Sequence, residues 1–108
     1  MKVNELVDLL RLEVLNLSDG EREIHGGYTG DLLSWVMSRA EADNVWVTIM
    51  TNINVVAVAQ LTDVACVIIA EDAEVTKEVV SRAEAQGINL FRSVRTSWEL
   101  IGAIADKV

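Results

Sequence analysis

The chain has 108 residues, 51% of them hydrophobic, and 17 acidic against 9 basic side chains give a formal net charge of -8. This length predicts one domain, residues 1–108, that can bury a real core. The acidic balance and the scattered basic residues argue against nucleic acid as a partner, and no apolar run approaches the roughly 20 residues that cross a bilayer.

The amino terminus predicts no export signal. Met1 to Glu5 carries an early acid and leads into an amphipathic segment, so we expect a cytoplasmic protein that does not enter a membrane. The single cysteine, Cys66, has no partner for an intrachain disulfide. It lies within an apolar run, which favours a buried small residue over a reactive thiol.

The first third of the chain predicts a helix and a strand. Val3, Leu6, Val7 and Leu10 recur at helical spacing and indicate an amphipathic helix. A strand is predicted over Val14 to Leu17, ending at a Ser-Asp-Gly turn, and extended chain resumes at residues 22–24.

A glycine-rich segment, His25 to Asp31, is predicted to be a loop that leads into a second helix. Asp31 is placed to cap that helix. Trp35 falls off the apolar stripe, so we expect it at a margin or interface. The predicted stripe itself consists of Leu32, Leu33, Val36, Met37 and Ala40.

Two strands, Val45 to Met50 and Val64 to Ala70, are apolar on both faces, as parallel strands under helices are. The segment between them, Asn52 to Leu61, leaves two alternatives. Its β-branched residues favour a strand, whereas capping candidates at its start favour a helix. We predict a helix, because parallel neighbours need a crossover.

The last third predicts helix, strand and helix. An acidic start at residues 71–74 precedes a helix that Gly87 ends, and Ile88 to Phe91 forms a short strand. Thr96 or Ser97 caps a closing helix whose inner face holds Trp98, Ile101, Ile104, Ala105 and Val108. The predicted fold is therefore a three-layer α/β domain, with a mostly parallel sheet and helices on both faces.

The run from Gly26 to Ser34, followed by Trp46-Val-Thr-Ile and Asn54-Val-Val-Ala-Val-Ala, resembles the free-standing DRTGG-domain proteins. The likeness extends from about Val14 to Leu100, although the string Asp-Arg-Thr-Gly-Gly itself is absent. Similar domains lie in HPr kinase/phosphorylase, in long bacterial phosphotransacetylases and beside CBS domains. The resemblance implies a regulatory domain without catalytic residues of its own, and a partner enzyme or kinase.

The glycine-rich segment leaves two interpretations open. Amides at a helix start attract anions, yet Gly30-Asp31-Leu32 stands where a Walker loop needs Gly-Lys-Ser/Thr, and Asp31 would oppose a phosphate. The favoured alternative is that the glycines only allow a tight turn with positive φ.

An enzyme would have to use His25 with Asp31, because no nucleophile, base and orienting group lie together in the sequence. A solvent-exposed loop histidine is the favoured alternative. Glu71, Asp72 and Glu74 cluster, but as a helix start rather than a metal site. We assign no catalytic residue, no metal and no cofactor.

Any ligand is predicted to bind beside the carboxyl ends of the strands, where open α/β sheets form their crevices. We expect a small polar ligand such as a nucleotide, because Arg92 or Arg95 offsets the acidic neighbours. The alternative is that the polar residues there only cap helices. The candidate ligand-binding residues are Gly26, Gly27, Thr29, Gly30, Asp31, Thr51, Asn52, Asn54, Arg92, Ser93 and Thr96.

Three functions follow from these patterns, in order of preference. The first is a non-catalytic regulatory module that senses a small polar ligand, docks on a partner enzyme, or both. The second is a protein-interaction subunit without a ligand, and the third is a small enzyme using His25 and Asp31. A homodimer is also expected, with an interface of Trp35, Val55, Val56 and Val58.

Overall fold

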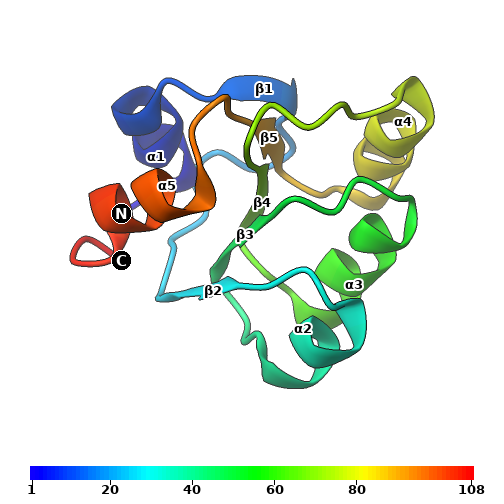
Figure 1. The fold of residues 1–108 in the computed structure, drawn as a ribbon, viewed down its shortest axis with the longest axis horizontal. Helices are drawn as coiled ribbons and strands as arrows, with labels where there is room; N and C mark the ends of the chain where they lie inside the picture. The colour runs from blue at the N-terminus through cyan, green and yellow to red at the C-terminus, as the bar shows by residue number, and fades with distance from the viewer.

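The computed structural model describes all residues from 1 to 108, and it contains five strands and five helices (Figure 1). In chain order these are α1 Val3–Leu10, β1 Glu13–Asn16, β2 Gly27–Thr29, α2 Leu33–Arg39, β3 Val45–Thr48, α3 Asn54–Thr62, β4 Cys66–Ile69, α4 Lys77–Gln86, β5 Leu90–Arg92 and α5 Ser97–Ile104.

The five strands form one sheet in the order β1-β5-β4-β3-β2. Strands β2, β3, β4 and β5 run parallel, and only β1, at one edge, is antiparallel to its neighbour β5. The predicted α/β class is confirmed, and α3 is the crossover that the parallel pair β3 and β4 requires.

Alternate side chains of the central strands divide the core into two halves, as the pleat of a strand dictates. Val45 and Ile68 pack with residues of α1 and α5 on one face. Trp46 and Val67 pack on the other face with residues of α2, α3 and α4. Figure 1 shows the same separation, with α1 and α5 on one side of the sheet and the other three helices on the opposite side.

Asn89, at the start of β5, joins distant parts of the chain. Its Oδ1 accepts hydrogen bonds from the backbone N–H groups of Ser18 and Asp19, at 2.8 and 2.9 Å. Its Nδ2 donates to the carbonyls of Asp19 and Ala65, at 2.8 and 3.0 Å. The buried amide therefore makes four bonds and fixes the turn after β1 against β4 and β5.

The glycine-rich segment is not simply a loop, because Gly27–Thr29 forms β2 and pairs in parallel with Val45–Val47. Short, glycine-containing edge strands carry little periodic signal, so the pattern did not predict it. Gly26, just before the strand, has φ of +70°, in agreement with the expected positive-φ turn.

Several side chains lie elsewhere than the helical wheel predicted. Trp98 was predicted on the inner face of α5 but is 86% exposed. Leu32 and Met37 were predicted on the apolar stripe of the second helix but are exposed as well. Val55, Val56 and Val58 are buried in the chain's own core, so the prediction that they form a dimer interface is wrong. Of the predicted interface residues, only Trp35 is exposed.

No helix of the chain has both the length and the apolar character needed to cross a membrane.

Candidate functional site

The carboxyl ends of the four parallel strands lie along one edge of the sheet, and most of the predicted ligand-binding residues follow these ends. Asp31 comes after β2, Thr51 and Asn52 after β3, and Ser93 after β5. The structure places them in a row along this edge, but it does not gather them around one cavity.

Asp31 joins the ends of β2 and β3 and does not cap α2. Its Oδ1 accepts hydrogen bonds from the Thr48 hydroxyl at 2.8 Å and from the Ile49 backbone N–H at 2.9 Å. The N-cap of α2 is Leu32, which makes no side-chain cap. The predicted capping role is therefore wrong, and the carboxylate is committed to the neighbouring strand.

Asn52, just before α3, serves the helix start. Asn52 Oδ1 accepts a hydrogen bond of 2.7 Å from the backbone N–H of Asn54, which forms a local turn at the first residue of α3. Thr51, Asn52 and Asn54 line none of the four cavities of the molecule. The bond made by Asn52 corresponds to the helix-start alternative.

Thr96 is likewise a cap. Its hydroxyl accepts a hydrogen bond of 3.1 Å from the Glu99 N–H, while a Glu99 carboxylate oxygen accepts one of 3.2 Å from the Thr96 N–H. This capping box starts α5. The bonds from the backbone and hydroxyl of Thr96 lower the pKa of Glu99.

Arg92 holds the loop after β4 against the end of β5. Its Nη2 donates to the Asp72 carboxylate at 2.7 Å and to the Asp72 carbonyl at 2.9 Å, and its Nε donates to the Ala73 carbonyl at 2.8 Å. Glu13 of β1 lies 3.5 Å from Nη1. All three guanidinium nitrogens are engaged, so Arg92 holds the loop at Asp72 and Ala73 in place.

The loops after β4 and β5 are bonded to each other through their backbones. The Glu71 N–H donates to the Arg95 carbonyl at 2.8 Å, and the Asp72 N–H donates to the Ser93 carbonyl at 2.9 Å. Glu71 and Asp72 both have positive φ, of 61° and 58°, which is unusual for two consecutive residues that are not glycine. The paired loops therefore keep this strained conformation in place.

A cavity of about 230 Å³ lies beside these loops, and three arginines line it. Arg11, at the end of α1, and Arg95 line it and form no ion pair, unlike Arg92. We call this cavity the arginine pocket; its lining residues are Leu10, Arg11, Glu13, Arg92, Ser93, Val94 and Arg95.

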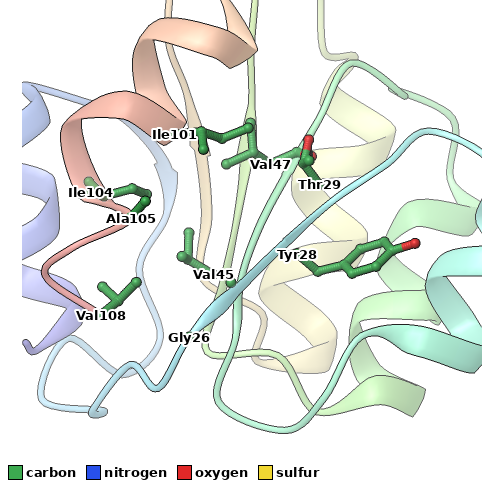
Figure 2. A pocket seen from close by; sticks show the side chains of 10 residues that line it. Gly26, Tyr28, Thr29, Val45, Val47, Ile101, Ile104, Ala105 and Val108 are labelled. Carbon is green, nitrogen blue, oxygen red and sulfur yellow. Dashed lines mark hydrogen bonds between the residues drawn. The ribbon is translucent and has the colours of Figure 1, made fainter.

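Gly26, Gly27 and Thr29 line a different cavity, of about 220 Å³, which we call the apolar cavity (Figure 2). No charged side chain lines it. In Figure 2 the Tyr28 ring points away from α5, whereas Val45 lies on the side of α5. Residues of β2 and β3 face the end of α5 across it, and the remaining lining residues are Tyr28, Val45, Val47, Ile101, Ile104, Ala105 and Val108.

His25 and Asp31 lie at opposite ends of β2, so the strand separates the two residues of the enzyme hypothesis. No group of three or more His, Cys, Asp or Glu side chains is placed to hold a metal ion. Cys66 is fully buried, and this burial raises the pKa of its thiol to about 12.

The sequence pattern missed four of the seven residues that line the arginine pocket. Arg92 and Ser93 were among the candidate residues and Arg95 was expected near the ligand, but Leu10, Arg11, Glu13 and Val94 were not considered. Arg11 and Glu13 reach this pocket because β1 pairs antiparallel with β5. The sequence could have indicated Arg11 and Glu13 only if the pairing of the first and last strands had been known. Local periodicity carries no information on that pairing.

No family model matches the chain, and no curated protein matches it either. Among solved structures, it is similar to the CBS and DRTGG domains of the regulatory region of a pyrophosphatase from Clostridium perfringens, a structure that contains the activator diadenosine tetraphosphate. The TM-score is 0.73 at 13% sequence identity, over 96% of this chain and 46% of that one. The chain thus spans about half the length of that regulatory region, and the likeness shows a shared fold.

Proposed function

We propose that the protein is a non-catalytic regulatory module that senses a small anionic ligand of the nucleotide class in the arginine pocket. The observation that carries this proposal is the placement of Arg11 and Arg95, which line one cavity without an ion-pair partner. In a chain with a net charge of -8, two unpaired guanidinium groups at one cavity mark the place where an anion is best accommodated.

The chemistry of the pocket fits a phosphate group. A guanidinium offers a planar fork of N–H donors that matches phosphate oxygens in pairs. The Ser93 hydroxyl lines the same cavity and already accepts a 3.1 Å hydrogen bond from the Arg95 backbone N–H, so it can donate its proton to a ligand oxygen. Arg92 lies 3.5 Å from the Glu13 carboxylate and reduces its repulsion of an anion.

The fold likeness supports both parts of the proposal. The similar structure is a regulatory region crystallised with a dinucleoside polyphosphate activator. A domain of the same fold that senses a nucleotide here would pass the signal to a partner enzyme or kinase, in the cytoplasm. Binding would join the end of α1 to the loop that leads into α5, and α1 and α5 lie on the same face of the sheet.

Calorimetric titration with ATP, diadenosine tetraphosphate and inorganic pyrophosphate tests the proposal. We expect at least one of them to bind and to raise the melting temperature, because a ligand stabilises the folded state that binds it. Arg95→Gln should weaken binding about 10-fold or more, the effect of losing a charge-assisted bond. Arg82→Gln, at an exposed position on α4, is the matched control and should bind as the unaltered chain does.

The site is wrong if none of the three compounds binds, or if Arg95→Gln and Arg82→Gln bind equally well. A second candidate function, an interaction subunit without a ligand, is favoured by the exposed apolar side chains of α2 and its start. Leu32 is 61% and Trp35 is 56% exposed. A homodimer without any ligand response would support this second function.

A further inference from the structure

Strand β2 forms an open edge of the sheet. It has β3 on one side and no strand on the other. Gly27 and Thr29 are exposed, and Tyr28 between them is half-buried. Open edges are commonly protected by lysine, proline or a covering element, and neither lysine nor proline occurs between His25 and Asp31.

The register with β3 decides which backbone groups of this edge are free. The Val45 N–H donates to the Gly26 carbonyl at 3.1 Å, and the Gly30 N–H donates to the Val47 carbonyl at 3.3 Å. In a parallel ladder alternate residues of a strand bond to the neighbour, so Tyr28, opposite Trp46, also faces β3. Gly27 and Thr29 therefore direct their N–H and C=O groups outward.

We propose that a second copy of this chain pairs with β2 in antiparallel orientation, about a twofold axis at Tyr28. Such an axis places Gly27 of one copy opposite Thr29 of the other. These are the outward-facing residues, and residues of this kind exchange two hydrogen bonds per opposed pair in an antiparallel ladder. The three-residue edge is thus complementary to itself, as a symmetric dimer requires.

Side chains on the two faces of the edge fit this register. Gly27 has no side chain, and the opposed Thr29 of the second copy would lie beside it at the apolar cavity, which both residues line in one chain. The antiparallel orientation also brings His25 at one end of the strand toward Asp31 of the second copy. An imidazole, which can donate an N–H, therefore lies near a carboxylate at each end of the paired edges.

The flanking helix supplies the further area that a dimer needs. Stable interfaces bury about 800 Å² on each partner, far more than a three-residue ladder provides. The helix α2 lies beside β2, and the exposed Leu32 and Trp35 are at its start. The dimer would continue the sheet across two copies. Each arginine pocket would lie at an outer end, so this proposal does not depend on the nucleotide site.

Disulfide formation tests the register. Tyr28→Cys places two thiols opposite each other at a non-hydrogen-bonded pair, about 4.5 Å between Cα atoms, within disulfide range. Thr29→Cys is the matched control, because its thiols would lie diagonally across the axis and too far apart. We expect mild oxidation to give a covalent dimer with Tyr28→Cys and not with Thr29→Cys. Buried Cys66 does not compete.

Analytical ultracentrifugation tests the association itself. We expect twice the chain mass of 11.9 kDa at high micromolar concentration. Thr29→Pro removes an outward N–H from each copy and should weaken the dimer about 30-fold, with an unchanged circular dichroism spectrum. A monomer of the unaltered chain overturns the proposal. So does a dimer in which Tyr28→Cys fails to cross-link, and this second result holds even if Thr29→Pro does not fold.

Discussion

The Thr48 hydroxyl, which is completely buried at the end of β3, donates a 2.8 Å hydrogen bond to the Asp31 carboxylate. The same hydroxyl accepts a hydrogen bond of 3.2 Å from the Met50 N–H. Asp31, which belongs to the predicted ligand loop, therefore connects the ends of β2 and β3, and its substitution should lower the stability of the fold.

Asp31→Ala should destabilise the fold by about 1–3 kcal/mol, because it leaves the buried Thr48 hydroxyl and the Ile49 N–H without their acceptor. Asp31→Asn keeps an acceptor oxygen and should cost less. Urea denaturation measures both, with Asp8→Ala, at an exposed position of α1, as control. Equal stability of Asp31→Ala and Asp8→Ala would show that the bond contributes nothing.

Asn89→Ala should be among the most damaging single substitutions, at about 3–5 kcal/mol, since four backbone groups, in three part-buried bonds and one buried bond, lose their partner. Asn89→Asp tests the donor half separately, because a carboxylate cannot donate to the Asp19 and Ala65 carbonyls. Thermal unfolding should place both variants well below Asn54→Ala, whose side chain makes no such bonds. A melting temperature near that of Asn54→Ala would contradict this role.

The capping box at Thr96 predicts a dependence of stability on pH. The hydrogen bonds from Thr96 lower the pKa of Glu99 below its ordinary value of 4.5 in the folded state, so the unfolded chain binds more protons in this range. The contribution of Glu99 is present above the unfolded-state pKa and is lost as pH falls through the folded-state value. Glu99→Gln should make the acid limb of the stability curve shallower, and an unchanged limb would refute this.

Cys66 should not react with thiol reagents while the chain is folded. Complete burial raises the pKa of its thiol to about 12, so almost no thiolate exists at neutral pH and no reagent reaches it. Labelling by iodoacetamide should proceed only through unfolding and accelerate in parallel with loss of circular dichroism in urea. Rapid labelling of the native protein would be the contrary result.

Much of the fold could be predicted from local patterns. Continuous apolar runs predicted β3 and β4, and the need for a crossover correctly decided that residues 52–61 are helical. The strand β2 was missed because Gly-Tyr-Thr has no alternation long enough to identify. Trp98 was predicted to be buried because a helical wheel gives only the direction of each side chain around the helix axis. It does not show which of these side chains the sheet covers.

The candidate site was harder to predict than the fold. The carboxyl-edge rule found Arg92 and Ser93. Asn52 and Thr96 satisfy the same rule, but only because their side chains bond to the start of a helix. Arg11 and Arg95 are brought to one cavity only by the pairing of β1 with β5. Such pairings between the two ends of a chain have no local signature.

The pairing of β1 with β5 also sets an order of folding. It joins Glu13 to Arg92 and Val14 to Phe91, whereas β3 and β4 are neighbours linked by one short helix. The chain between β1 and β5 is the longer loop, and closing it costs more chain entropy. The pairing of β1 with β5 should therefore form after the centre of the sheet and open before it. Hydrogen exchange would then be faster in β1 than in β4. Because residues on both sides of the β1–β5 pairing line the arginine pocket, an anion bound there would slow hydrogen exchange first at β1.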